Sequence, residues 1–284
     1  MNPAFQKDEL LLADIAQARA EGRPRLWWFG QSGFLMVTRE ATILFDPYLS
    51  DSLTNKYATT DKPHTRITER VIAPELLTGI DIITSSHNHT DHLDAETLLP
   101  LFQANPQAKL LIPRANRAFV LDRLGPVEDR IEEIDAGETR HIGNIEWTGI
   151  PAAHNTVERD ANGCCRFLGF VAKIGGFCIY HSGDTLLHDG LVPALAPHAP
   201  DIALVPINGN LPERRVSGNL DGKEAAGLAH EIGAGLAIPH HFDMFDFNTA
   251  SPGLFVVECK RHGQAYHVLR NGEGLDLLSL PENP

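Results

Sequence analysis

Apolar and polar positions in the N-terminal part of the chain follow two different periods. Between Asp8 and Glu21 the apolar residues recur at roughly helical spacing, and Gly22 and Pro24 end the run. The pattern predicts a helix that serves internal packing or an oligomer interface. Three short apolar runs follow, separated by glycine-rich and polar turns, and they predict the start of an antiparallel sheet. These runs are Leu26–Phe29, Phe34–Val37 and Thr42–Phe45.

Farther along, patterns of buried strands and amphipathic helices alternate. The predicted helices are Ala95–Phe102, with Asp94 as its N-cap, and Gly222–Ile232. Hairpin turns of two residues are predicted at Gly175-Gly176 and Asn271-Gly272. The remaining predicted strands are Ile80–Thr84, Lys109–Ile112, Ile145–Ile150, Phe167–Ile174, Phe177–Tyr180, Ile202–Pro206, Gly235–Ile238, Gln264–Arg270 and Leu275–Leu280.

This order of elements favours an α/β fold. Two similar halves of antiparallel strands, each followed by alternating strands and helices, suggest two sheets packed face to face with helices on both outer sides. We take residues 1–24 as an N-terminal helical extension and residues 25–284 as one domain, because no linker or low-complexity tract divides the chain. The polar stretch from Asp51 to Arg70 lacks periodicity, and such a long loop is typical of a lid or of a local excursion near an active site.

Composition narrows the partners and the location. The 284 residues are 43% hydrophobic and 21% charged, which suits a sizeable core. A formal net charge of −13 would repel polyanions, so we expect a small-molecule substrate rather than nucleic acid or an anionic membrane. No basic and apolar leader and no long apolar run occurs, which favours the cytoplasm. The four cysteines lack C-x-x-C spacing and are expected to be reduced thiols.

The densest chemical signal is Ser86-His87-Asn88-His89-Thr90-Asp91-His92, between a predicted buried strand and a predicted helix. Side chains two apart on an extended segment point the same way, so His87 and His89 can bind one ion while Asp91 and His92 face a second. A solvated polar loop would account for one or two histidines. Three imidazoles and a carboxylate in so short a segment favour a metal site.

Three later segments each place a further candidate ligand at the end of a predicted strand. They supply His154, Asp184, and one of His240 and His241, of which we favour His241 because it stands two residues after Pro239. The two carboxylate oxygens of Asp184 could bind two ions at once, and the small Gly183 before it would allow a close approach. His181 and His188 are given no catalytic role.

The order H-x-H-x-D-H, a lone His, S-G-D and P-x-H resembles the metallo-β-lactamase superfamily, over most of residues 25 to 280. The resemblance implies a four-layer αβ/βα sandwich with two divalent metal ions per chain. It implies His87, His89 and His154 as ligands of the first ion, Asp91, His92 and His241 as ligands of the second, and Asp184 as the bridge. Zinc or manganese suits these ligands best, and iron would also fit.

A site of this kind implies hydrolysis by water that the ions activate. Asp91 could orient that water and accept its proton, and we expect Asp91 and His241 to serve catalysis as well as metal binding. The sequences around Trp27-Trp28, Tyr180 and Pro239 resemble the L-ascorbate-6-phosphate lactonase group, which implies a small ester or lactone as substrate. A phosphorylated sugar lactone would need basic residues, for which Arg214, Arg215 and Lys223 are candidates.

Four other functions share some of these sequence features. A phosphodiesterase or phospholipase D-like hydrolase would use the same site. A di-iron redox protein of this fold would be expected to carry an acidic residue in place of His89, and a nuclease would need a basic surface or a clamp domain. A non-catalytic metal sensor or scaffold would keep the ligands without turnover. The N-terminal helix leaves room for a homo-oligomer.

Overall fold

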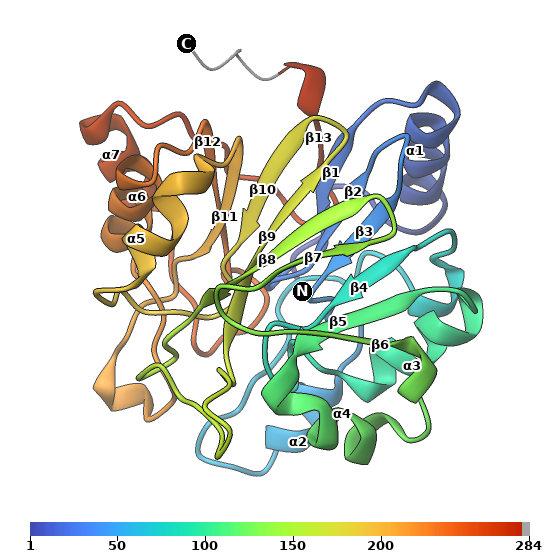
Figure 1. Ribbon diagram of the computed structural model, residues 1–284, viewed down its shortest axis with the longest axis horizontal. Coiled ribbons are helices and arrows are strands. Elements are labelled where there is room, and N and C mark those ends of the chain that lie inside the picture. Colours follow the sequence, from blue (N-terminus) through green and yellow to red (C-terminus); the bar gives the residue numbers. More distant parts are fainter. Residues whose placement is uncertain (280–284) are drawn as a thin grey trace.

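The computed structural model describes residues 1–279 and shows two mixed sheets packed face to face (Figure 1). Within these residues the first sheet has seven strands in the order β13-β1-β2-β3-β4-β5-β6, and the second has six in the order β12-β11-β10-β9-β8-β7. The first comprises β1 (Arg25–Trp28), β2 (Phe34–Val37), β3 (Thr42–Phe45), β4 (Ile82–Thr84), β5 (Lys109–Pro113), β6 (Ile131–Ile134) and β13 (Gly274–Asp276). The second comprises β7 (Thr139–Ile142), β8 (Ile145–Pro151), β9 (Leu168–Ile174), β10 (Phe177–His181), β11 (Ile202–Pro206) and β12 (Leu236–His240).

Both sheets change from antiparallel to parallel pairing partway across. Strands β1, β2 and β3 are antiparallel, whereas β3 to β6 pair in parallel. The second sheet repeats this plan, with β7 to β10 antiparallel and β10 to β12 parallel. Parallel neighbours direct their carboxyl ends to one edge of the sheet, so the loops after β4, β10 and β11 can meet there.

Helices cover the outer face of each sheet. In Figure 1 the helices α1 (Asp8–Glu21), α3 (Ala95–Ala104) and α4 (Arg117–Leu124) lie beside the first sheet. The helices α5 (Leu191–Leu195), α6 (Gly222–Glu231) and α7 (Gly253–His262) lie beside the second, and α2 (Ser52–Tyr57) precedes β4. The predicted four-layer arrangement is confirmed.

The alternation within the first strands assigns side chains to two separate cores. Leu26 and Trp28 of β1 belong to the core between the sheets, whereas Trp27 packs in the core beneath the outer helices. Because successive side chains of a strand point to opposite faces, a strand covered on both faces is apolar at every position. This explains why β1, β2 and β3 read as continuous apolar runs.

Helix α1 has the predicted bounds and packs on the first sheet. Leu11, Ile15 and Ala18 are buried in the core beneath the outer helices. On the same helix Asp14 accepts a hydrogen bond of 2.8 Å from the indole Nε1 of Trp27 and pairs with Arg25. The helix therefore forms part of a layer of the sandwich.

Several elements differ from the prediction. The segment Gln264–Arg270 is not a strand: Tyr266 makes a single bridge to Ala237, and Pro239, the next residue that would donate to it, has no N–H. Of the predicted strand Leu275–Leu280, β13 forms only at its start and a 3₁₀ turn follows, while Leu280 lies outside the described residues.

The prediction also omitted β6 and β7 and the helices α2, α4, α5 and α7, of which α2 lies within the expected loop from Asp51 to Arg70. Helix α7 buries only Phe255 and Cys259, one turn apart, and its adjacent valines are poor helix formers. The four cysteines are free, as expected. Asp94 holds the N-cap position of α3, but its carboxylate accepts from the Ser50 and Thr97 hydroxyls rather than from backbone N–H groups. Among residues 1–279, no helix combines the length and apolar character needed to cross a bilayer.

Helix α6 begins with a capping box that offers a test of this local structure. The Asp221 carboxylate accepts from the backbone N–H of Lys223 and of Glu224, and the Glu224 side chain accepts from the N–H of Asp221. Replacing Asp221 by Ala should lower the free energy of unfolding by about 1 kcal/mol, because it leaves helix donors unpaired. Urea denaturation measures this. The control Lys223→Ala changes an exposed side chain of the same helix, and equal stability of the two variants would contradict the assignment.

Candidate metal centre

The candidate ligands gather at one edge of the sandwich from four segments that each follow a strand. The loop after β4 carries His87 to His92, the segment after β8 carries His154, Asp184 follows β10, and His241 follows β12. Both sheets contribute, so the site straddles their interface. All seven predicted ligands come together here, and five of them line a cavity of about 480 Å³.

Three overlapping groups of side chains could each hold a metal ion. They are His87, His89 and His154; His87, His92 and Asp184; and Asp91, His92 and His241. Within each group the ligand atoms lie within 4.8 Å of one another. Two of these groups are the first and second ligand sets implied by the sequence.

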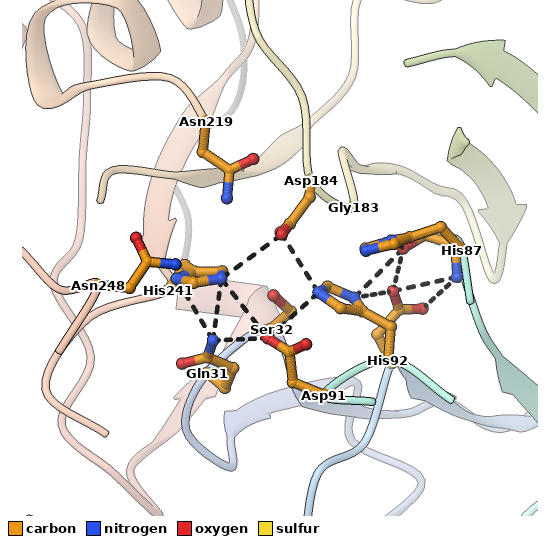
Figure 2. A network of polar contacts seen from close by, with 12 residues as sticks. Gln31, Ser32, His87, Asp91, His92, Gly183, Asp184, Asn219, His241 and Asn248 are labelled. Atoms are coloured by element: carbon orange, nitrogen blue, oxygen red, sulfur yellow. Dashed lines mark hydrogen bonds and ion pairs between the residues drawn. The ribbon is translucent and has the colours of Figure 1, made fainter. Parts of the chain in front are cut away.

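Asp184 lies at the centre of the cluster (Figure 2). One carboxylate oxygen, Oδ1, is 3.3 Å from His92 Nε2. The other, Oδ2, is 3.5 Å from His154 Nε2 and 3.5 Å from His241 Nε2. The two oxygens thus face different imidazoles, as a bridging carboxylate would require. A Cβ on Gly183 would lie 2.5 Å from the Ser86 Cβ, so only glycine permits this approach.

Several buried atoms of the cluster have no hydrogen-bond partner within the described residues. These are His87 Nε2, His92 Nε2 and Asp184 Oδ1. Leaving a buried polar atom unpaired costs roughly 1–3 kcal/mol, so native proteins rarely do so without a reason. A divalent cation would engage all three, because imidazole nitrogens and carboxylate oxygens are its usual ligands. The donor set therefore fits a metal.

The charges of the imidazoles also suit this role. Burial lowers the pKa of His87 well below its ordinary value, lowers that of His89 to about 4, and lowers that of His154. These rings are therefore neutral near pH 7, with a lone pair free. Burial alone would lower the pKa of His92 as well, but the Asp184 and Asp91 carboxylates raise it well above its ordinary value. Excess negative charge at this position would attract a cation.

Asp46, at the end of β3, holds His92 in place and was not predicted. The His92 Nδ1–H donates to Asp46 Oδ2 at 2.7 Å, which turns Nε2 toward Asp184. The Thr84 hydroxyl, the Ser86 hydroxyl and the Ser86 N–H also donate to this fully buried carboxylate. Burial would raise the pKa of Asp46, yet the His92 hydrogen bond and the nearby His181 hold it well below the usual range. The available sequence signal for Asp46 was its position directly after a buried strand and before a proline.

His241, and not His240, faces the candidate ligands. His240 is buried, stacks on His181 at 5.3 Å and lies 3.2 Å from the Ser32 hydroxyl. His241 adopts a left-handed backbone with φ of 61°, which turns its ring toward Asp91. His181 and His188 donate to the backbone carbonyls of Ser32 and Pro151, so each serves the support of the site rather than the cluster itself.

Gln31 is a second functional residue that the sequence did not single out. Its Nε2 donates to Asp91 Oδ2 at 2.8 Å and lies 2.9 Å from His241 Nε2. Its backbone also lies in the left-handed region, with φ of 48°. Strain of this kind persists where the surrounding structure fixes a functional geometry. Gln31 thus links the first strand pair to the ligands of the second predicted ion.

The cavity above the cluster has a basic lining, although the net charge of the whole chain is negative. Lys56, Lys62, Arg123 and Arg215 line it, and its only carboxylates among the described residues are Asp91 and Asp184. Of the three basic residues named from sequence, Arg215 lies at the cavity, Arg214 holds backbone and amide oxygens, and Lys223 lies at the start of α6. The segment from Asp51 to Arg70 supplies Leu53, Lys56, Tyr57, Lys62 and His64 to the cavity wall.

Residues 41–242 match the model of the family described as the beta-lactamase superfamily domain. A protein of Opitutus terrae named UPF0173 metal-dependent hydrolase is 29% identical over 258 residues, covering 89% of this chain and 100% of its own. Among solved structures, the isothiocyanate hydrolase from Delia radicum gut bacteria superposes with a TM-score of 0.70 at 16% identity, covering 88% of this chain and 98% of its own. CmlA, a diiron β-hydroxylase from Streptomyces venezuelae, gives 0.67 at 18% identity, covering 90% of this chain and 54% of its own. These structural likenesses concern the fold.

Replacing Asp46 by Asn should weaken metal binding about 10- to 100-fold, because outer partners of a metal-binding histidine fix its ring and raise its basicity. The amide would also turn N–H groups toward the Thr84 and Ser86 donors. Competition with a chromophoric chelator measures the affinity. The control Asp122→Asn alters a carboxylate on α4 that lies outside this network. Unchanged affinity in the Asp46 variant would show that Asp46 does not orient His92 for a metal.

Proposed function

Because this chain belongs to the beta-lactamase superfamily, we propose that it is a metal-dependent hydrolase that cleaves a small ester or lactone with two divalent ions. The observation that carries the proposal is the set of buried, unpartnered ligand atoms beside a cavity of about 480 Å³. A cavity of this size suits a small molecule rather than a polymer. The relatives named metal-dependent hydrolases support the reaction class.

His87, His89 and His154 would hold one ion, Asp91, His92 and His241 the other, and Asp184 would lie between them. When bound, the two ions would supply an activated water at neutral pH and polarise the scissile carbonyl. Zinc or manganese fits the nitrogen-rich set, and iron, which CmlA is named for, fits it too. The protein side chains have the same proton-transfer and positioning roles with each of these metals.

The side chains of the chain itself perform the proton and positioning steps. Asp91 accepts a hydrogen bond from Gln31 through Oδ2, which fixes the carboxylate that would take a proton from the attacking water. Burial would raise the pKa of Asp91, but His92 lowers it, so the carboxylate is ionised and able to act as a base. Tyr57, His64 and Phe245 contact one another and form an aromatic wall on one side of the cavity.

The basic lining supports a substrate with a negative group away from the scissile bond, such as a phosphorylated lactone. Lys56 reaches the Thr90 hydroxyl at 3.3 Å, beside the ligands Asp91 and His92, and makes no ion pair with a described residue. Lys62 donates to the Arg215 carbonyl, and Arg215 pairs with Asp61. Cationic side chains around a pocket attract an anionic substrate even where the whole chain is negative. The same lining would accept a phosphodiester, which makes a phosphodiesterase the second candidate.

Replacing Asp184 by Asn should abolish hydrolysis and release metal, because an amide cannot supply two anionic oxygens. The assay compares 4-nitrophenyl acetate, a lactone and bis(4-nitrophenyl) phosphate, before and after chelation. Activity on the ester or lactone that chelation removes and metal restores supports the proposal, whereas activity on the diester alone selects the phosphodiesterase. Bound metal with no turnover of any of these would contradict a hydrolase and favour a metal sensor.

Replacing Lys56 by Gln should raise KM about two- to fivefold for an ester that carries a remote carboxylate or phosphate, since such an exposed ion pair contributes roughly 1 kcal/mol or less. KM for a neutral ester with the same leaving group should stay as it is. Lys260→Gln, on α7, removes the same charge away from the cavity. An equal change of KM for the charged and neutral esters would contradict anion recognition.

A further inference from the structure

Three asparagines form a chain of hydrogen bonds that ends at the cavity. The Asn219 Nδ2 donates to Asn208 Oδ1 at 3.0 Å, and the Asn208 Nδ2 donates to Asn248 Oδ1 at 3.0 Å. Asn208 and Asn219 are buried, whereas Asn248 is only partly covered and lines the cavity together with Asp91, Asp184 and His241. Each amide in the chain donates in the same direction, toward the cavity.

Arg214 fixes which way the last amide points. A guanidinium can only donate, and Arg214 lies 3.2 Å from Asn248 Oδ1, so that atom must be the carbonyl oxygen. The same guanidinium donates to the backbone carbonyls of Asn208 and Thr249 at 2.6 and 2.9 Å. Two donors therefore saturate the Asn248 oxygen, and a flipped amide would set N–H groups against N–H groups.

The NH₂ group of Asn248 is the free end of this arrangement. No residue from 1 to 279 accepts a hydrogen bond from it. Figure 2 shows the nitrogen on the side of Asn248 that points toward His241, with the oxygen turned away. The backbone of Asn248 has φ of 53°, a left-handed conformation that asparagine tolerates better than most residues. The backbone conformation of Asn248 and the two hydrogen bonds to its Oδ1 thus fix the direction of its NH₂ group.

We propose that Asn248 is a catalytic residue whose Nδ2–H donates to the substrate oxygen that becomes negatively charged during hydrolysis. This inference rests on the proposed function. Water adds to the carbonyl carbon, the π-electron pair moves to the carbonyl oxygen, and that oxygen accepts the Asn248 hydrogen bond. One water proton passes to Asp91. Collapse then breaks the bond to the leaving oxygen, which takes the proton from Asp91, so that one water and one ester give one acid and one alcohol.

A donor already aimed at this position needs no reorganisation during the reaction, which is what makes such groups effective. The chain of amides contributes to this, because polarisation along consecutive hydrogen bonds strengthens the terminal donor. The hydrogen bonds that hold this loop leave the Asn248 NH₂ group available to a ligand in the cavity.

The test compares Asn248→Asp with Asn248→Ala on a neutral ester. The aspartate keeps an acceptor for Asn208 and Arg214 but removes the donor, so it separates catalysis from loop structure. Both variants should lower kcat about 10²- to 10³-fold with little change in KM, the usual cost of losing one such donor. Metal content and Tm of Asn248→Asp should match the unaltered protein. Asn210→Asp adds the same charge at an exposed position nearby and serves as control.

A second readout does not depend on turnover. A phosphonate that mimics the tetrahedral state should bind Asn248→Ala weaker by the same factor as kcat falls, while a ground-state amide analogue should bind both proteins alike. A kcat within threefold of the unaltered protein in both variants, or loss of metal together with activity, would overturn the assignment. If the unaltered protein hydrolyses no ester or lactone, the proposed function itself fails, whatever the variants do.

Discussion

The burial of the Asp184 carboxylate among imidazoles is the constraint on which the site depends. Burial would raise its pKa, but His241 and His92 hold the pKa well below the usual range, so the group stays ionised in the interior. An isolated charge of this kind is costly unless it is paired. His87 and His154 are neutral near pH 7, and two ring nitrogens, His87 Nε2 and His92 Nε2, lack a hydrogen-bond partner among the described residues. A divalent cation would balance the carboxylate charge and engage these nitrogens.

The Asp184 carboxylate lies at this position because the two sheets meet along one edge of the sandwich. Each sheet changes from antiparallel to parallel pairing, so the loops after parallel strands open toward the same side. Glycine at 183 and left-handed backbone at Gln31, Asp46 and His241 then bring the side chains within reach. The strained positions cluster at this edge, which is where pre-organised geometry is needed.

How much of this could be predicted from sequence depended on how local each signal is. The spacing in the loop from His87 to His92 and the continuous apolar runs of β1 to β3 are local signals. The full ligand groupings followed from the resemblance to the metallo-β-lactamase superfamily, and the described residues bring the same side chains together. Asp46 and Gln31 contact candidate ligands from distant parts of the chain, and Asn248 reaches the cavity wall from the loop after His241, so no local pattern identifies these three residues. The prediction of a strand at Gln264–Arg270 was wrong for a similar reason. Its alternation fits a strand, but the partner strand presents Pro239 and cannot continue the ladder.

The fold does not determine the substrate. Proteins with this sandwich include a named isothiocyanate hydrolase and a named diiron β-hydroxylase, so the architecture alone does not select a reaction. The proposed ester or lactone substrate rests instead on this chain's own lining, with basic side chains around a small cavity and the amide nitrogen of Asn248 directed toward His241.

The central claim is that Asp184 and six side chains around it hold two divalent ions, and the metal content of the purified protein tests it most directly. Elemental analysis of protein prepared without added metal should give two equivalents of divalent metal per chain, falling to zero after chelation and returning to two on dialysis against zinc, manganese or iron. A folded protein that contains no metal and takes up none from any of these ions would contradict the account.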